Sequence, residues 1–441
     1  MLLMRTGRSV ARTLMATVLA AAALTGCAVG KETGADRLSN GRVTLRLDWW
    51  GSDERQRITA KAVKLFEKKH PRVHVQLEYS DWNGYWDRLA TMAAAGSPPD
   101  VIQMDQLYLS SYADRGALLD LGRSKFLDRD RMSPKVLDTG RYKKTLYAVP
   151  AGVTVMGVAV NTTLLDKLGV GLPDTRTWSW DDYESFAAKV TRASGGKVVG
   201  ALPLTGQSAL ELFARQRGDK VFDDKGHVAL RPDTLKAFWD EGLGLIKSKG
   251  TLGRSQLADA AALPLEQSPF STGKAATSVI FASQLPAYAA ASGGDKIVTV
   301  DLPADKGATA RSQYLKSSMY WSISAQTQHP AEAAQLVNFL TGDKGAAKIL
   351  GAERGLPAVP ALRDEIKSSL TPEDRTAAKF VEAVENGRLG SPPALTPSGA
   401  SDFETTLARY WQEVMFGQRT VDGAARAFLK ETADKIYSAG G

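Results

Sequence analysis

Cysteine, histidine and long apolar runs are scarce in this sequence of 441 residues. Cys27 is the only cysteine, which excludes an intrachain disulfide and a structural zinc site with two or more cysteine ligands. Two of the four histidines, His70 and His74, have the spacing of metal ligands on a helix. Pro71 lies between them and the segment alternates as a strand, so we predict no metal site there. Beyond the N-terminal segment, no stretch is apolar for long enough to cross a membrane.

Dense basic blocks and catalytic motifs are also missing. The net charge of +8 is spread along the chain, which argues against a nucleic-acid partner. The sequence contains no H-E-x-x-H, G-x-S-x-G, Walker or G-x-G-x-x-G motif. Ser271 and Lys274 match the S-x-x-K spelling, but the motifs that accompany it in enzymes are absent. We therefore predict a protein that is not an enzyme and needs no cofactor.

Residues 1–26 have the features of a bacterial secretory signal. A start with three arginines is followed by an apolar run too short to be a stop-transfer helix. The last residues, Leu-Thr-Gly-Cys at 24–27, resemble the lipobox of bacterial lipoproteins. That resemblance implies that Cys27 becomes the first mature residue and carries a lipid, and two acyl chains give stable anchoring. Residues 27–41 are polar and contain several glycines, which favours a flexible tether.

Strand and helix patterns alternate after residue 42. Apolar residues occupy every second position in 43–47 and again in 73–79, which predicts two strands. Between and after them, apolar residues recur at helical spacing, and Gly96-Ser97-Pro98-Pro99 ends the second helix. Residues 101–104 then form a short buried strand. The order strand, helix, strand, helix, strand is typical of a parallel sheet covered by helices.

Aromatic and acidic residues follow each of these strands. Loops after parallel strands open at one edge of the sheet, where open α/β sheets bind ligands. Carboxylates suit the hydroxyls of a sugar and aromatic rings suit its C–H faces. The candidate ligand-binding residues here are Trp49, Trp50, Asp53, Asp81, Trp82, Asp105 and Tyr108. Alternatives remain open, because adjacent tryptophans on a strand face opposite sides and an aspartate at a strand end can be a helix N-cap.

Three segments carry a family resemblance. MAAAGSPPDVIQMD, residues 92–105, resembles the signature of extracellular solute-binding proteins of carbohydrate-uptake ABC transporters, the group that contains the maltose-binding proteins. FSTGKAA, residues 270–276, and ERGLP, residues 353–357, are similar to two further segments of that family. The resemblance implies a two-lobed periplasmic-binding-protein-like α/β fold, in which each lobe is a mostly parallel sheet flanked by helices and three segments cross between the lobes. It places residues 42–152 and 297–350 in lobe 1, and residues 153–296 and 351–441 in lobe 2.

The same resemblance implies further ligand contacts. Ser283 and Gln284 follow a strand at a point where the family often has a tryptophan that this sequence lacks. Tyr320 and Trp321 lie together on another predicted strand, so one faces each way. Arg354 lies in the final crossing loop, where it can bind ligand or clamp the lobes by a salt bridge.

These features predict an exported, monomeric protein that is lipid-anchored to the outer face of the cytoplasmic membrane. We expect it to bind a sugar or oligosaccharide between its lobes and to deliver it to the permease subunits of an ABC transporter. Two other functions remain open. One is an exported glycoside hydrolase, for which Asp81 and Asp105 could supply the paired carboxylates. The other is the same fold with a peptide, polyamine or metal ligand, of which metal fits the composition least.

Overall fold

The computed structural model describes residues 37–440 except 52, 307, 309–311 and 388. The predicted signal segment 1–26, Cys27 and the tether residues up to 36 lie outside the described residues. None of the helices in the described part is both long and apolar enough to cross a membrane.

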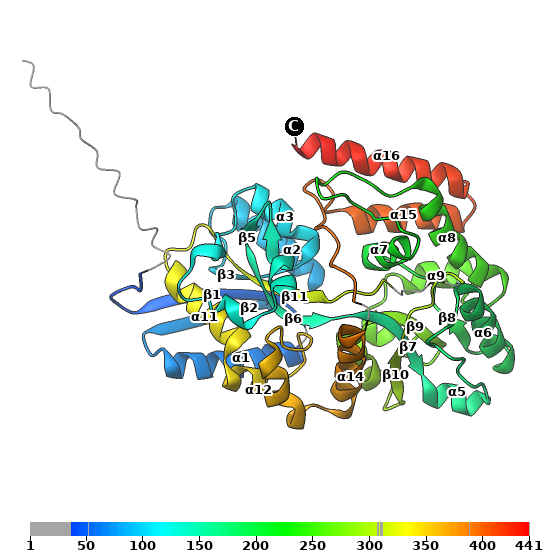
Figure 1. Cartoon of the computed structure of the whole chain (residues 1–441), viewed down its shortest axis with the longest axis horizontal. Helices are drawn as coiled ribbons and strands as arrows, with labels where there is room; N and C mark the ends of the chain where they lie inside the picture. The colour runs from blue at the N-terminus through cyan, green and yellow to red at the C-terminus, as the bar shows by residue number, and fades with distance from the viewer. Residues whose placement is uncertain (1–36, 52, 307, 309–311, 388, 441) are drawn as a thin grey trace, which may run out of the picture. The chain divides into compact units, whose positions relative to one another are not determined.

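The first lobe is built on a five-stranded sheet in the order β2-β1-β3-β11-β6 (Figure 1). β1 runs parallel to β2 and β3, whereas β11 is antiparallel to β3 and β6. The strands are β1 (Val43–Trp50), β2 (Val73–Ser80), β3 (Val101–Met104), β6 (Ala148–Thr154) and β11 (Lys316–Ile323). Its helices are α1 (Asp53–Lys69), α2 (Trp82–Ala94), α3 (Gln106–Asp114), α11 (Pro330–Gly342), α12 (Lys344–Leu350) and α13 (Pro360–Ile366).

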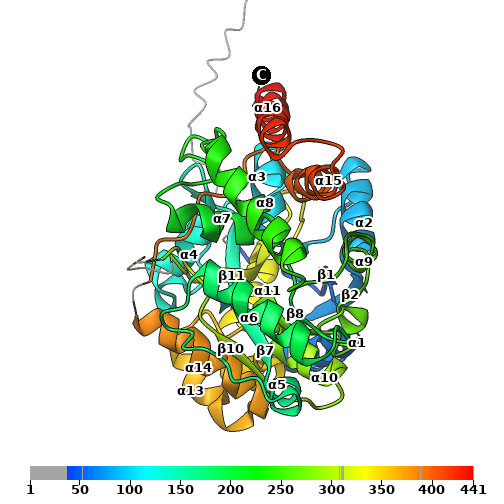
Figure 2. The same ribbon diagram turned by 90° about the vertical axis from the view of Figure 1, so that its right-hand side faces the viewer.

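The second lobe is built on a four-stranded sheet in the order β10-β7-β9-β8. Its strands are β7 (Met156–Asn161), β8 (Val199–Ala201), β9 (Ala275–Phe281) and β10 (Ile297–Val300). Helix α6 packs on β8 and against α8, and both helices lie toward the viewer in Figure 2. The helices of this lobe are α5 (Thr162–Leu168), α6 (Trp180–Ala193), α7 (Gln207–Gln216), α8 (Pro232–Lys247), α9 (Arg254–Ala260), α10 (Leu285–Ala291), α15 (Phe403–Met415) and α16 (Val421–Gly440).

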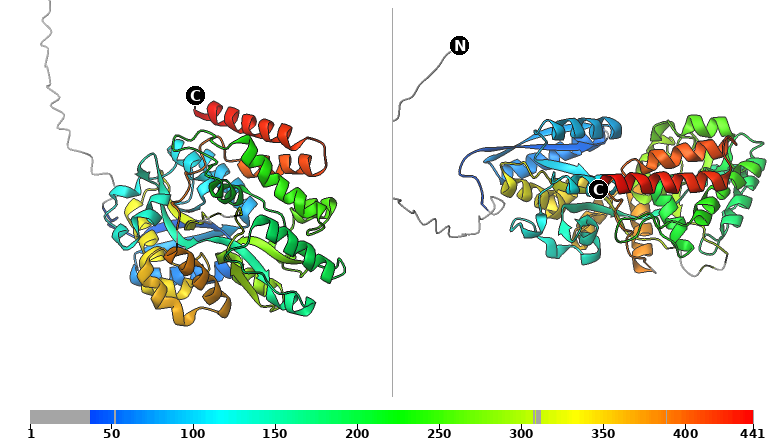
Figure 3. Two further views of the ribbon diagram at one scale, coloured as in Figure 1. Left: turned by 45° about the vertical axis from the view of Figure 1, so that its right-hand side comes forward. Right: turned by 90° about the horizontal axis from the view of Figure 1, so that it is seen from above.

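The two C-terminal helices pack on the second lobe. α16 lies against α8 and α15. The C-terminal helices α15 and α16 run side by side in both views of Figure 3. Helix α14 (Pro372–Asn386) contacts α10 and β10 instead. The remaining short elements are α4 (Pro134–Leu137), β4 (Arg141–Tyr142) and β5 (Thr145–Leu146).

Three segments connect the lobes. The first is the junction of β6 and β7 at Val155, and the second, residues 301–315, joins β10 to β11. The third is residues 367–402. It leaves α13, which packs on α12 of the first lobe, forms α14 against α10 and β10 of the second lobe, and then runs past Ser110 of the first lobe to α15.

Two of the predicted lobe boundaries are corrected by the strand pairing. Ile297–Val300 was assigned to lobe 1 with residues 297–350, but it pairs antiparallel with β7 in the second sheet. The chain returns to the first sheet only at Lys316. Likewise α13, assigned to lobe 2, packs on α12 of lobe 1. An apolar alternating strand has the same pattern in either sheet, so the sequence pattern alone did not reveal its partner.

The pleat of the strands separates adjacent aromatic residues. Trp49 and Trp321 belong to the core under α1 and α11, whereas Trp50 and Tyr320 belong to the cluster under α2 and α3. This confirms that the members of each adjacent pair face opposite sides of the sheet.

Candidate ligand-binding site

The carboxyl ends of the three parallel strands meet at one edge of the first sheet. Trp50 at the end of β1 pairs with Ser80 at the end of β2, and Asp48 of β1 pairs with Ile102 of β3. That register puts the ends of β1, β2 and β3 level. The segments that follow therefore leave the sheet together, and they lead directly into α2 and α3.

Five aromatic side chains gather at this edge. The Trp50 ring lies 5.0 Å from that of Trp82 and 5.3 Å from that of Tyr85, both in edge-on geometry. Trp86 stacks on Tyr108 with ring centroids 3.9 Å apart. Trp50, Tyr85 and Trp86 are buried, whereas Trp82 and Tyr108 are half-buried. The result is an aromatic wall, made of Trp50, Trp82, Tyr85, Trp86 and Tyr108.

Asp105 lies between this wall and the place where the first sheet approaches the second. Its Oδ1 accepts a hydrogen bond of 3.0 Å from the backbone N–H of Leu107 and caps α3, and its Oδ2 lies 3.8 Å from the Nζ of Lys316. Lys316 is buried at the start of β11, and its Nζ lies 5.2 Å from the ring centroid of Phe281 at the end of β9. The Asp105–Lys316 pair thus stands where the two sheets approach each other.

The second lobe contributes a carboxylate, Glu404, whose charge interacts with that of Asp105. Glu404, near the start of α15, accepts a hydrogen bond of 2.8 Å from the backbone N–H of Gln207 at the start of α7. Burial raises the pKa of Glu404, and the negative charge of Asp105 raises it further. Burial also raises the pKa of Tyr108, with additional contributions from Asp105 and Glu404. The charges of carboxylates from both lobes thus act on the Tyr108 hydroxyl.

The third crossing segment ties the two lobes together at this point. The hydroxyl of Ser110 on α3 donates to the carbonyl of Thr396, and the Nε2 of Gln207 donates to the Thr396 hydroxyl at 2.8 Å. Thr396 therefore contacts the first lobe through its backbone and the second lobe through its side chain.

A cavity of about 370 Å³ adjoins Glu404 in the second lobe. Trp239, Phe238 and Trp411 supply aromatic surface to its wall, and Gly206 and Thr205 supply backbone and hydroxyl groups. Gly206 has φ +83°, a conformation that favours glycine, and a Cβ there would lie 3.0 Å from the Oε2 of Glu404. The chain can therefore pass close to the carboxylate only because this residue has no side chain.

Six of the predicted ligand residues are buried: Trp50 and Asp105, at 9% and 8% exposed, belong to the aromatic wall and its edge, and four others pack elsewhere. Trp49, Tyr320 and Trp321 are at most 2% exposed and pack in the core of the first lobe. Arg354, 5% exposed, donates to the Oε1 of Gln103 and the hydroxyl of Thr59, and burial lowers its pKa to about 9. The guanidinium thus holds α1 and β3 together, so these four side chains are not part of the ligand surface in this structure.

Four other predicted residues lie away from the aromatic wall or at its rim. Asp53 is exposed and accepts a hydrogen bond of 3.1 Å from the Tyr79 hydroxyl, and Asp81 caps α2 through the N–H of Gly84. Gln284 accepts from the backbone N–H of Phe281. Ser283 lines a hollow of only about 10 Å³ beside α14.

Several residues of the site were missing from the sequence prediction. Glu404, Gln207 and Lys316 lie at the starts of two helices and a strand, where the residue pattern shows only element boundaries. Trp86, which was not among the candidates, is buried against Tyr108. One signal was available for Glu404: it is the only acidic residue in the first turn of its amphipathic helix.

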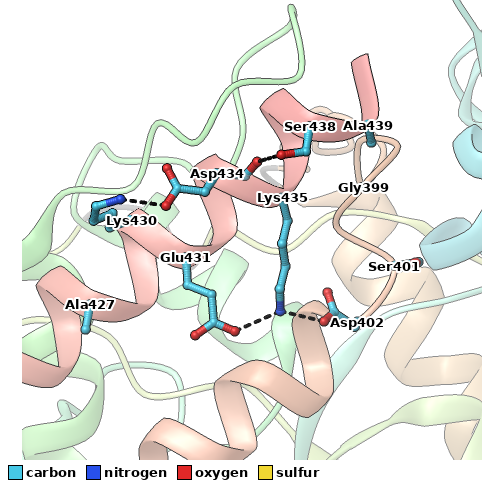
Figure 4. A pocket seen from close by; sticks show the side chains of 10 residues that line it. All are labelled: Gly399, Ser401, Asp402, Ala427, Lys430, Glu431, Asp434, Lys435, Ser438 and Ala439. Atoms are coloured by element: carbon cyan, nitrogen blue, oxygen red, sulfur yellow. Dashed lines mark hydrogen bonds and ion pairs between the residues drawn. The ribbon is translucent and has the colours of Figure 1, made fainter. Parts of the chain in front are cut away.

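Two other hollows have a different character. One, of about 330 Å³, lies between residues 391–395 and the first lobe and is bordered by Lys316 and Tyr320. The other, of about 680 Å³, runs along α16 (Figure 4). Its charged side chains pair with one another, as Lys435 does with Asp402 and Glu431, and its described lining contains no aromatic residue. The groove on α16 therefore lacks the ring surface that the aromatic wall provides.

Comparison with known proteins identifies the family of this chain. The family model of bacterial extracellular solute-binding proteins matches residues 61–378. The chain belongs to this family. The solute-binding protein is 22% identical over 340 residues to the multiple sugar-binding protein of Streptococcus mutans, an alignment that covers 72% of this chain and 76% of that one.

Solved structures share the fold of the solute-binding protein. A periplasmic oligogalacturonide-binding protein from Yersinia enterocolitica, solved with saturated digalacturonic acid, superposes with a TM-score of 0.77 at 24% identity, covering 90% of this chain and 100% of that one. An ABC substrate-binding protein from Listeria monocytogenes, solved with cycloalternan, gives a TM-score of 0.75 at 21% identity, with 90% and 99% covered. The predicted two-lobed fold and family are thereby confirmed.

Proposed function

We propose that this solute-binding protein captures a sugar or oligosaccharide between its two lobes and delivers it to an ABC transporter permease. The observation that carries the proposal is the aromatic wall beside Asp105, whose helix α3 is joined through Thr396 to Gln207, the partner of Glu404 in the second lobe. Half-buried rings beside carboxylates suit the C–H faces and hydroxyls of a sugar. The sugar-binding relative and the two oligosaccharide complexes support the same ligand class.

Binding rather than hydrolysis fits the environment of the carboxylates. A glycosidase needs one carboxyl group free to transfer a proton and another free to attack or to activate water. In this protein the Oδ1 of Asp105 is committed to the α3 cap and the Oε1 of Glu404 to the Gln207 N–H. Asp81, the other carboxylate considered for such a pair, caps α2. We therefore expect a bound sugar to leave the protein unaltered.

We further propose that Cys27 carries the lipid that retains the protein at the outer face of the cytoplasmic membrane, with the residues from 28 up to Ser39 as the tether. The lipobox-like sequence at 24–27 supports this. Ser39 hydrogen-bonds to Glu332 and His329 of the first lobe, so the predicted tether ends there, and about eleven residues span up to about 35 Å when extended. Such a reach lets the folded body meet a permease in the same membrane.

Intrinsic tryptophan fluorescence of the purified full-length protein in mild detergent tests the function. Trp50, Trp82 and Trp86 lie in the wall, so a ligand there changes their emission. We expect a saturable change with a sugar in a panel of mono- and oligosaccharides, and recovery of that sugar unaltered. A response only to peptides or polyamines would remove the carbohydrate function, and conversion of the sugar would favour a hydrolase.

A further inference from the structure

The charges inside the proposed sugar site do not balance. Asp105 of the first lobe is 8% exposed and caps α3. Glu404 of the second lobe accepts from the N–H of Gln207, whose side chain is joined to α3 through Thr396, and the charges of both Asp105 and Lys316 act on it. Lys316 is the only cation that the structure pairs with either carboxylate among the described residues, and it lies beside Asp105. Two carboxylates against one ammonium leave an excess negative charge in a partly desolvated place, although the protein as a whole carries +8.

The residue whose backbone bonds Glu404 also holds a buried acceptor. Gln207 is 4% exposed, its Nε2 is bonded to Thr396, and its backbone N–H is bonded to Glu404. Its Oε1 is buried and has no hydrogen-bond partner among the described residues. A buried acceptor without a donor is destabilising, so a ligand that brings a donor to this point gains what the free protein lacks.

The rim of the site has the same sign. Asp87 on α2 acts on Tyr108 together with Asp105 and Glu404, and Asp81 lies exposed at the entrance to α2. Nearby arginines are already engaged: Arg88 pairs with Asp48, and Arg55 pairs with Glu353 at 2.5 Å. A carboxylate on the ligand would therefore be repelled by several negative groups. Lys316, the cation beside them, is already paired with Asp105.

Resting on the proposed function, we propose that the cleft discriminates sugars by charge: it favours an amino-bearing sugar over its neutral counterpart and excludes sugars that carry a carboxylate. The ammonium group of an amino sugar supplies three donors and one positive charge, which suits Glu404 and the Gln207 oxygen together. A uronic acid brings a further acceptor and a further negative charge. The structural relative that holds digalacturonic acid thus shares the fold but differs in the ligand charge that we expect here.

Calorimetric titration of the full-length protein with matched sugar series tests this selectivity. The series are glucose, galactose and mannose, each with its 2-amino and uronic-acid counterpart, as mono- and disaccharides. In the series that binds, we expect the amino sugar to bind about tenfold tighter than the neutral sugar, because a hydrogen bond to a charged group contributes about 1.5 kcal/mol. The uronic acid should show no saturable binding at millimolar concentration.

The Glu404→Gln variant isolates the charge. Glutamine keeps an oxygen that can accept from the Gln207 N–H, so the start of α7 keeps its partner while the negative charge is removed. We expect the preference for the amino sugar to fall to about twofold or less. The matched control is Glu413→Gln on the same helix, where the carboxylate pairs with Arg409 and Arg419 at the surface, and this variant should keep the wild-type preference.

Each outcome separates this inference from the function on which it rests. A uronic acid that binds as tightly as the neutral sugar, or an amino-sugar preference that survives in Glu404→Gln, overturns the charge selectivity and leaves sugar binding intact. If no member of any series binds while a peptide or polyamine does, the proposed function and this inference both fail.

Discussion

The substitution Trp82→Ala tests the aromatic wall most directly. Trp82 is the first residue of α2, and its ring lies edge-on to Trp50 at 5.0 Å and to Trp86 at 5.5 Å. These contacts hold one side of the ring while part of it stays exposed. If the exposed part covers the C–H face of a sugar, its removal weakens binding and leaves the fold in place.

The size of the effect follows from the ring area that remains open. An aromatic side chain can bury about 200 Å², and for a half-buried ring roughly a quarter of this, about 50 Å², is left for the ligand. At about 25 cal/mol per Å², that area contributes about 1.3 kcal/mol. Stacking geometry adds about 0.5–1 kcal/mol. The sum is close to 2 kcal/mol, which corresponds to a roughly thirtyfold rise in Kd.

Isothermal titration with the sugar identified by fluorescence measures this change. Tyr437→Ala is the control, because Tyr437 is an 83% exposed aromatic residue on α16, far along the chain from the wall. Circular dichroism melting shows whether each variant is folded. A folded Trp82→Ala protein whose Kd rises less than threefold would refute the assignment of Trp82 to the ligand surface.

Three other substitutions test an ion pair beside the site, a buried carboxylate and the proposed lipid anchor. Asp105→Asn keeps the oxygen that caps α3 but removes the charge beside buried Lys316, so urea denaturation should show a loss of about 2 kcal/mol in unfolding free energy; an unchanged value would mean that the ion pair contributes nothing. Burial raises the pKa of Asp48 to about 6, above its usual 3.8, so the native state loses stability as pH rises from about 4 through 6. Asp48→Asn should therefore be up to about 3 kcal/mol more stable than the wild type at pH 8 and no more stable below pH 4, and a gain that does not depend on pH would contradict this cause. Cys27→Ser should move the protein from the membrane fraction to the soluble exported fraction, and retention in the membrane would exclude the lipid anchor.

The strand-end rule predicted half of the site from the sequence. Trp50, Trp82, Asp105 and Tyr108 converge because parallel strands in register deliver their following loops to one edge. The sequence also required that Trp49 and Trp50 face opposite sides, but alternation does not say which face is the interior. That choice depends on where α1 and α11 pack, and it left Trp49 in the core with Trp321.

The other half of the site depends on long-range contacts that no local pattern contains. Glu404 is about 300 residues from Asp105 in the chain, and it reaches the site through the third crossing and the start of α15. Gln207 is the first residue of α7, and the preceding Gly206, the N-cap of that helix, indicates a helix start but no ligand contact. Arg354 is instructive in the opposite direction, because a charged residue in a crossing loop suggested ligand binding, yet Thr59 and Gln103 hold it inside the first lobe.

The groups proposed to recognise the ligand also connect the lobes. Lys316 begins β11 at the end of the second crossing and contacts Asp105 of the first lobe and the Phe281 ring of the second. Asp105 and Glu404 are like charges on different lobes, so holding the lobes together without a ligand costs electrostatic energy that one lysine offsets only in part. A sugar that places donors between them removes this cost and so binds the closed arrangement more tightly than an open one. A difference in affinity between two arrangements is what shifts their populations, so under the proposed selectivity the same carboxylates would also make closure depend on the ligand.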